Sequence, residues 1–435
     1  MSLLRKGILV SGGQVVSIAL SMLAGILFSR TLGPDGMGQV DLFRSTANIV
    51  GVVFAMGLGP ASIYLLNNRK VPLVALVTNS VKVSVVLGAV LAAALAVTIL
   101  RVPEYFGVVS AAVAIVFSVG VGAVLMTNLV RPVLVAQLDA RRMVAVDLAA
   151  PTIILLAGTV LWLVGCLEPG IVLAVGALGC IAAAAMVVTF LRREVDLASP
   201  FDWSLLGQGL VYGLKLAATN VLYVLSYNVT VLLLRYLTPE RFDDVGLYTR
   251  AVAICSLVTL VPSAIGPLLY AKWSAMTGQA RTNQAEMALR LNVAYGATAM
   301  VGILLLGKYI IWILYGAAFI PAEATLVFLA PALFLIPIFG VCSNLLASDG
   351  RAALSAFILA GTVVVVSVVT WVGVPLWGIR GAALAVLCAN TFTAAGVVAV
   401  CVWLYGMNPL RCVLLRRSDI AYILAALRPS AAAPK

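Results

Sequence analysis

Long apolar stretches separated by short polar breaks are the feature that most constrains this chain. Each stretch is about 20 residues or longer, which is the length of helix that crosses the hydrocarbon core of a bilayer. Only 10% of the residues are charged, against about 25% in soluble domains. So few charges cannot cover a soluble fold of this size. Because lipid offers no hydrogen bonds to an open backbone, the stretches must be helices. The sequence predicts an all-α polytopic membrane protein.

Charges, prolines and glycines mark the breaks between these stretches and predict twelve transmembrane helices. The most polar linker in the middle of the chain covers residues 192–203 and is taken as the border between two six-helix bundles. The predicted domains are therefore residues 1–196, residues 197–409 and a cytoplasmic tail at 410–435. The predicted spans are 8–29, 41–66, 73–100, 107–130, 143–165, 169–191, 206–235, 246–271, 289–314, 322–347, 353–374 and 380–405.

Basic residues in the loops predict the orientation. Pairs such as Arg141 and Arg142, or Arg192 and Arg193, follow even-numbered spans, whereas the opposite loops carry fewer basic residues and several acids. By the positive-inside rule, both termini are expected in the cytoplasm and the protein in the cytoplasmic (inner) membrane. Contact of this face with anionic lipid accounts for the net charge of +12, and no nucleic acid partner is needed. The first span has no A-x-A cleavage site after it and is expected to be retained.

Residues that carry covalent or metal chemistry are scarce. The chain has no histidine and seven scattered cysteines, none of them in a CxxC pair. There is no phosphate-binding glycine loop, nucleophile motif or metal-ligand spacing. We therefore predict no enzyme activity, no cofactor and no metal site.

An internal repeat relates the two halves. The pattern Arg-x-Leu-x-Pro-acid begins at Arg30 and again at Arg235, 205 residues later (235 − 30). Arg44 and Arg250 form a second pair, 206 residues apart (250 − 44), and each is followed by Gly-Pro and by a tyrosine at the twentieth residue. Two further pairs support the repeat: Lys82 with Arg290, and the loop Asp139–Arg141 with the loop Asp349–Arg351.

The repeat predicts how the halves are related. Six spans in each unit is an even number, so both units point the same way across the membrane. A pseudo-two-fold axis along the membrane normal is expected, with the substrate path between the halves.

Basic side chains inside the predicted spans are the candidate site. A Lys or Arg at the centre of a span costs about 2.5–3.5 kcal/mol on insertion scales, so it usually faces water or a partner. Few acids are available, and Asp41 and Asp147 are the ones taken as plausibly within spans, both near span ends. A cavity lined in this way would be cationic and would suit a phosphate or pyrophosphate. The candidate cavity residues are Arg44, Arg250, Lys82, Lys215, Arg30 and Arg235.

Other interpretations of these residues stay open. Arg30 and Arg235 lie at span ends, where they could reach lipid headgroups instead. Lys82 and Lys215 could lie outside the membrane if the span boundaries are misplaced. Arg290 is interpreted as a cytoplasmic boundary residue. The two Asp-x-Arg loops are interpreted as structural pairs that cap helices or set the topology.

A polar aromatic stripe is predicted in the seventh span. Asn220, Tyr223 and Tyr227 lie three and four residues apart, so they share one helix face. The stripe could contact sugars, or Asn228 and its neighbours could form hydrogen bonds between helices.

Several motifs resemble a known transporter family. The stretch from Gly25 to Tyr64 contains Ser-Arg-Thr-Leu-Gly-Pro-Asp-Gly-Met-Gly and then Gly-Leu-Gly, and it resembles the amino-terminal signature of polysaccharide flippases. These form the Wzx-like branch of the superfamily that also contains lipid II flippases and MATE multidrug exporters. The segments Val245–Tyr248, Tyr315–Phe319 and Gly378–Ala385 resemble later spans of the same family.

The resemblance implies a MATE-like fold of two six-helix bundles with alternating access to a central cavity. It also implies transport of undecaprenyl-pyrophosphate-linked oligosaccharides to the outer leaflet. Cationic cavity residues of lipid II flippases map best to Arg44 and Arg250, but the two additional carboxy-terminal spans of those flippases are missing here.

We therefore expect a flippase for polysaccharide biosynthesis. Its partners would be a polyprenyl-pyrophosphate-linked glycan, the lipid bilayer and glycan polymerase or assembly proteins. The alternative is a MATE-like ion-coupled exporter of drugs or organic cations, which would require more acids within the spans. A glycan polymerase or ligase is a third reading, but the chain lacks the large outer loop that such enzymes usually need.

Overall fold

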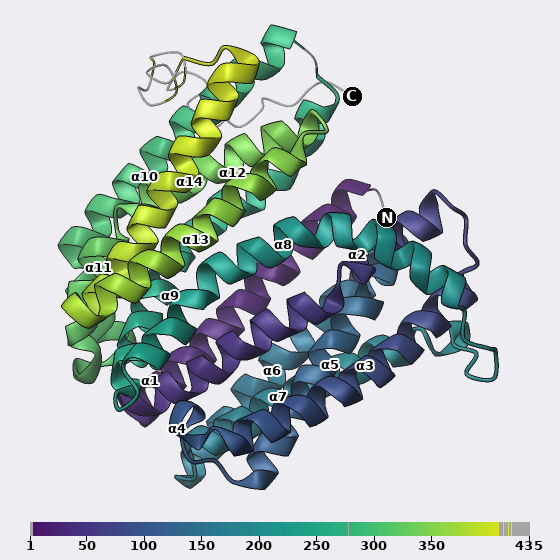
Figure 1. Ribbon diagram of the computed structural model, residues 1–435, viewed down its shortest axis with the longest axis horizontal. Coiled ribbons are helices and arrows are strands. Elements are labelled where there is room, and N and C mark those ends of the chain that lie inside the picture. Colours follow the sequence, from purple (N-terminus) through teal and green to yellow (C-terminus); the bar gives the residue numbers. More distant parts are fainter. Residues whose placement is uncertain (1–2, 277, 409–411, 413–415, 417–418, 420–435) are drawn as a thin grey trace, which may run out of the picture. The chain divides into compact units, whose positions relative to one another are not determined.

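The computed structural model describes residues 3–276, 278–408, 412, 416 and 419 (Figure 1). All elements in these residues are helical. The helices, in chain order, are α1 (Leu3–Ala55), α2 (Leu58–Asn67), α3 (Leu73–Arg101), α4 (Pro103–Phe106), α5 (Ala111–Ala136), α6 (Ala140–Val164), α7 (Pro169–Phe190), η1 (Arg192–Glu194), α8 (Trp203–Leu237), α9 (Phe242–Ser274), α10 (Gly278–Tyr315), η2 (Ala317–Ala322), α11 (Glu323–Leu329), α12 (Ala332–Ser348), α13 (Ala352–Trp377) and α14 (Ile379–Tyr405).

The all-helical membrane fold expected from the sequence is confirmed. Within the described residues, nine helices are long and apolar enough to cross a membrane. The number is ten if the bent pair of residues 317–329 and 332–348 counts as one span. The predicted number of twelve stays a prediction.

Helix α1 contains the first predicted span and the beginning of the second in one run, and α2 continues the second. It has 53 residues, or about 80 Å at 1.5 Å per residue, which is too long for a single crossing. Gly33 interrupts it with φ 68° and ψ −176°, a backbone conformation that is open almost only to glycine. Pro34 follows and cannot donate a hydrogen bond to the preceding turn. The sequence thus contains the break that separates two spans.

Contacts between helices divide the chain into two compact units. The first is Met1–Thr249 with Ile311–Pro321, and the second is Arg250–Ile310 with Ala322–Lys435. Helix α8 lies in the first unit because it packs on α1 and α2. The compact units therefore divide within α9 and α10, whereas the repeat divides the sequence at the linker near residue 196.

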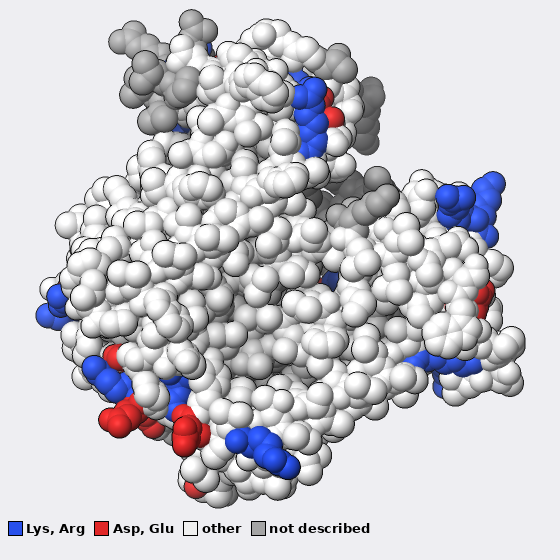
Figure 2. Space-filling view, viewed as in Figure 1, with Lys and Arg blue, Asp and Glu red and all other residues white. Residues whose placement is uncertain are grey.

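Each unit has its own apolar core. In the first, Phe43 of α1 packs against Phe106 and Phe117 with ring centroids 5.3 and 4.9 Å away. In the second, buried Trp273 and Leu345 belong to a cluster formed by α9, α10, α12 and α14. Figure 2 shows charged side chains in a few small groups, with long stretches of uncharged surface elsewhere on the visible face. Such a distribution is expected for a protein surrounded by lipid.

Candidate functional site

Helices α1 and α9 cross at two glycines within the first unit. A Cβ atom on Gly38 would lie 1.9 Å from the carbonyl oxygen of Phe242, and one on Gly246 would lie 2.0 Å from that of Pro34. Phe242 follows Pro34 by 208 residues (242 − 34), and Gly246 follows Gly38 by the same number (246 − 38). The contact is therefore reciprocal, as at a two-fold axis, and only glycine allows the backbones to come this close.

The reciprocal pattern continues one turn further along α1. Thr249 donates its hydroxyl hydrogen to a carboxylate oxygen of buried Asp41 at 2.6 Å, and these residues are also 208 apart (249 − 41). The structural register of the repeat at this crossing is thus 208. The register of 206, which paired Arg44 with Arg250, is wrong here by two residues, and the position equivalent to Arg250 is Leu42.

The corrected register explains why the two arginines differ. Two residues rotate a helix position by about 200°, so Arg44 and Arg250 do not lie on equivalent faces. The Arg44 side chain is 52% exposed, with its guanidinium 3.8 Å from the Asp41 carboxylate. Arg250 is only 6% exposed. Arg44 is therefore an open cationic group of the first unit, whereas Arg250 is packed into the second.

Lys82 holds the linker between the two sequence halves. Its ammonium group donates to the carbonyl of Ser199. One turn earlier on α3, the Thr78 hydroxyl accepts from the backbone N–H of Asp196 at 2.9 Å. The polar linker thus lies beside the first turns of α3, at the level of Lys82. This placement favours the interpretation in which Lys82 lies near the membrane boundary.

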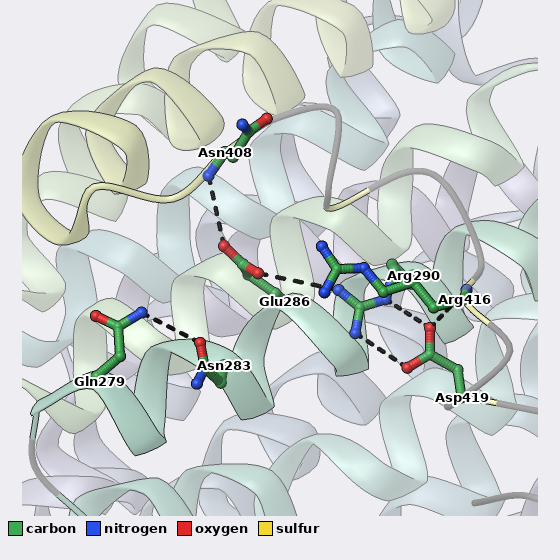
Figure 3. A network of polar contacts seen from close by, with 7 residues as sticks. All are labelled: Gln279, Asn283, Glu286, Arg290, Asn408, Arg416 and Asp419. Carbon is green, nitrogen blue, oxygen red and sulfur yellow. Dashed lines mark hydrogen bonds and ion pairs between the residues drawn. The ribbon is translucent and has the colours of Figure 1, made fainter. Parts of the chain in front are cut away.

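Arg290 holds the carboxy-terminal segment in a similar way (Figure 3). Its Nε donates to one oxygen of Asp419 at 2.7 Å and its Nη2 to the other at 3.0 Å. One turn earlier on α10, Glu286 accepts from the backbone N–H of Asn408 at 3.4 Å. Arg290 and Asp419 are 5% and 2% exposed. The Arg290 guanidinium lowers the pKa of the Asp419 carboxyl, so the pair is ionised at neutral pH.

These two anchors occupy equivalent positions in the repeat. Glu286 and Arg290 follow Thr78 and Lys82 by 208 residues each (286 − 78 and 290 − 82), the same offset as the α1–α9 crossing. In the first half, α3 binds the linker that follows the sixth predicted span. In the second half, α10 binds residues that follow the twelfth. Of the predicted tail at 410–435, Cys412 and Asp419 are buried, and most other positions lie outside the described residues.

Arg30 and Arg235 donate hydrogen bonds to backbone carbonyls at or near helix ends. Arg235 is 2% exposed and donates to four backbone carbonyls, including those of Tyr105 and Glu104 at 2.7 Å each. Its guanidinium also lies 3.6 Å from the ring centroid of Phe242. Arg30 is exposed and donates to the last carbonyls of α10. This geometry favours a structural role for Arg235 and leaves Arg30 accessible.

The polar aromatic stripe of the seventh predicted span lies on an open face of α8. Asn220, Tyr223 and Tyr227 are all exposed, and the two tyrosine rings have centroids 4.8 Å apart. Asn228 donates to the carbonyl of Val224 in its own helix at 2.9 Å. The side chain of Lys215 lies outside the described residues.

The structure contains an ion pair between α5 and α6 that was not predicted from the sequence. Nε of Arg131 donates to a carboxylate oxygen of Asp147 at 2.6 Å, and Nη2 binds the other oxygen. Ser17 of α1 donates to the Asp147 carbonyl at 3.0 Å. The fourth predicted span ends at residue 130, which placed Arg131 in a predicted loop. In the structure, α5 continues beyond Arg131. A lone acid in an apolar span was the signal that a basic partner lay nearby.

Of the two Asp-x-Arg loops, only the first has an acid that caps a helix, because the N-cap residue of α13, Arg351, makes no side-chain capping hydrogen bond. Asp139 accepts from the backbone N–H of Arg142 at 3.2 Å and so caps α6. Its ion pair is with Arg142 at 3.3 Å, not with Arg141. In the second half, Asp349 pairs with Arg351 at 3.2 Å.

Comparison with known proteins identifies the fold. No family model matches the sequence, and no curated protein matches it. A multidrug resistance MATE family transporter in an inward-facing conformation is similar, with a TM-score of 0.74 and 16% identity over 95% of this chain and 96% of that one. The chain has the fold of MOP-superfamily transporters.

Two further solved structures support this fold. The lipid II flippase MurJ in its inward closed conformation has a TM-score of 0.73, with 13% identity over 93% of this chain and 89% of that one. A MOP-superfamily transporter from Pyrococcus furiosus, described by the reverse polarity of its binding pocket, has a TM-score of 0.65, with 14% identity over 92% and 94%. At these identities the likeness concerns the fold and leaves the cargo undetermined.

Proposed function

We propose that this protein is a flippase that moves undecaprenyl-pyrophosphate-linked oligosaccharide across the cytoplasmic membrane for polysaccharide biosynthesis. The observation that carries the proposal is the exposed side chain of Arg44 within an apolar helix. A guanidinium facing lipid costs about 2.5–3.5 kcal/mol, whereas one facing a hydrated path can bind an anion. A pyrophosphate is well matched, because arginine binds phosphate oxygens with paired hydrogen bonds.

The sugar part of the cargo needs a different surface. The exposed face of α8, with Asn220, Tyr223 and Tyr227, offers one amide and two phenol groups for hydroxyls and two rings for sugar faces. A cationic residue and a polar aromatic face in the same unit fit an anionic headgroup joined to a glycan. The polyprenyl chain would remain in the bilayer.

Pairing of the acids supports an anionic cargo over a cationic one. Asp147 is bound by Arg131, and Asp41 accepts from Thr249 and lies beside Arg44. Neither of these two carboxylates is thus left as an open site for a cation. A ligand shifts the equilibrium between inward-open and outward-open states only through its different affinity for them, and we assign that difference to the pyrophosphate on Arg44. Glycan polymerase or assembly proteins would receive the cargo outside.

Export of glycan in a deletion strain tests the proposal. The strain is complemented with wild-type protein, Arg44→Gln, the double variant Arg44→Gln/Arg250→Gln, or Arg69→Gln as a matched control with an exposed arginine in a turn. We expect both Arg44 variants to lose export and to accumulate lipid-linked glycan on the cytoplasmic leaflet, while Arg69→Gln exports normally. Normal export by Arg44→Gln and by the double variant at wild-type protein levels would refute the role of Arg44.

A MATE-like exporter of organic cations is the second candidate. The likeness in fold to a multidrug resistance MATE family transporter favours it, and buried Asp41 is the carboxylate that such an exporter would use once its contacts with Thr249 and Arg44 were broken. This candidate predicts that deletion raises drug accumulation, that Asp41→Asn behaves like the deletion, and that glycan export is unaffected.

A further inference from the structure

A furrow runs along one face of α1 in the first unit, separate from Arg44. It has a volume of about 560 Å³ and is bounded on the other side by α6. Its α1 residues follow the spacing of a single helix face, and the apolar ones come first. The lining residues are Leu23, Ile26, Leu27, Arg30, Thr31 and Trp162. The furrow is therefore apolar along its length and cationic at one end.

A second hollow of about 490 Å³ adjoins the cationic end of the furrow. It is lined by Arg30, Gly33, Trp312 and the backbone that follows the end of α10. Arg30 thus lies where the two hollows meet. Trp162 and Trp312 flank it from α6 and α10, and they are 48% and 56% exposed. Exposed tryptophans of membrane proteins are typical of the level of the lipid headgroups.

The Arg30 guanidinium is oriented by the protein and still has donors to offer. Nε donates to the carbonyl of Leu314 at 3.0 Å, and Nη2 donates to that of Ile313. Nη1 has no hydrogen-bond partner in the described part of the chain, and the side chain is exposed. The carbonyls are neutral, so the full positive charge remains for an anion at the end of the furrow.

We propose that the furrow binds an anionic phospholipid of the bilayer. An acyl chain lies along Leu23, Ile26 and Leu27, the phosphate binds Arg30, and the two indoles flank the headgroup. Charge complementarity carries the assignment, because Arg30 is the cation at the end of an otherwise uncharged furrow. The site does not depend on the proposed transport function, since it uses neither Arg44 nor the α8 stripe.

Quenching of Trp162 by brominated lipid tests the site. The full-length protein is reconstituted in vesicles of phosphatidylcholine with increasing brominated phosphatidylglycerol, and the signal of Trp162→Phe is subtracted to isolate Trp162. We expect a preference of Trp162 for brominated phosphatidylglycerol over brominated phosphatidylcholine. Arg30→Gln should reduce this preference about fivefold, the effect of one basic residue at a lipid surface.

Two variants separate lipid binding from other effects. Arg30→Lys keeps the charge and should keep most of the preference. Arg101→Gln removes another exposed arginine at the same predicted side of the membrane and should leave the preference unchanged. The proposal is overturned if wild-type Trp162 shows no preference, or if Arg101→Gln loses it as fully as Arg30→Gln. It is also overturned if undecaprenyl phosphate displaces the brominated lipid at lower concentration than phosphatidylglycerol does, because the furrow would then belong to the transport path.

Discussion

The contact between Arg290 and Asp419 tests whether α10 binds the chain that follows α14 in the way that α3 binds the linker of the first half. Both side chains are buried and joined by two hydrogen bonds of 2.7 and 3.0 Å. Removing one partner of a buried ion pair costs about 3–5 kcal/mol. Asp419→Asn keeps one acceptor oxygen, so we take the lower figure of about 3 kcal/mol. Every 1.4 kcal/mol is a factor of ten, so the undocked population should rise about 100-fold.

Limited trypsin digestion measures this population. Arg416 is exposed, but its backbone N–H donates to Asp419 at 3.0 Å, so cleavage after Arg416 requires the segment to leave its place. When opening and closing are fast relative to cleavage, the cleavage rate follows the open population. We expect Asp419→Asn to be cut about 100-fold faster than wild type.

A second variant controls for a general loss of charge near the segment. The nearest carboxylate oxygen of Glu286 lies 3.9 Å from the Arg290 guanidinium, and glutamine keeps an acceptor oxygen for the Asn408 N–H. Glu286→Gln should therefore raise the cleavage rate much less than Asp419→Asn does. Equal rates for wild type and Asp419→Asn would show that the ion pair does not hold the segment, and the equivalence of tail and linker would then be lost.

Three further perturbations have expected outcomes. Gly38→Ala should force α1 and α9 apart and lower the free energy of unfolding by about 1–3 kcal/mol or more. Gly51→Ala, whose added Cβ would lie 3.4 Å from its nearest atom, should leave the stability nearly unchanged. Thermal unfolding of both variants in detergent measures the difference. Arg131→Ala should leave Asp147 uncompensated and cost about 3–5 kcal/mol, and the double variant with Asp147→Ala should recover part of that stability in the same assay. The pKa of Asp419 is lowered in the folded protein, so its contribution is present above the unfolded pKa of about 3.9 and lost as pH falls through the lower folded value. Hydrogen exchange of the segment, corrected for intrinsic rates, should therefore show constant protection from pH 7 to 5 and a loss only below about pH 4.

The pairing of Lys82 with Arg290 shows how far the repeat could be followed without coordinates. The offset of 208 was visible in the sequence and agrees with the α1–α9 crossing. The role of the two basic residues could not be predicted. A basic residue inside an apolar run gives the same sequence pattern whether it faces a cavity or binds a polar segment that folds back beside it. The linker that satisfies Lys82 is more than 100 residues away, at Ser199.

The pairing of Arg44 with Arg250 shows the opposite case. Arg44 and Arg250 were paired because both are charged and their offset is close to that of the other pairs. The register of the helices is set instead by the residues that are in contact. Gly38 and Gly246 set the register because a Cβ atom at either position would collide with a backbone oxygen. The pairing of Arg44 with Arg250 was therefore wrong by two positions.

The sequence by itself determined the class of the fold, the approximate helix boundaries and the presence of two related halves. These depend on local apolar length and on breaks such as Gly33, which lie within a short stretch of chain. Only the tertiary structure decided which basic residues are open. Arg44 is exposed, while Arg235 and Arg290 are buried among carbonyls and carboxylates. Their partners come from distant segments, and the charge of a side chain does not indicate where its counter-group will be.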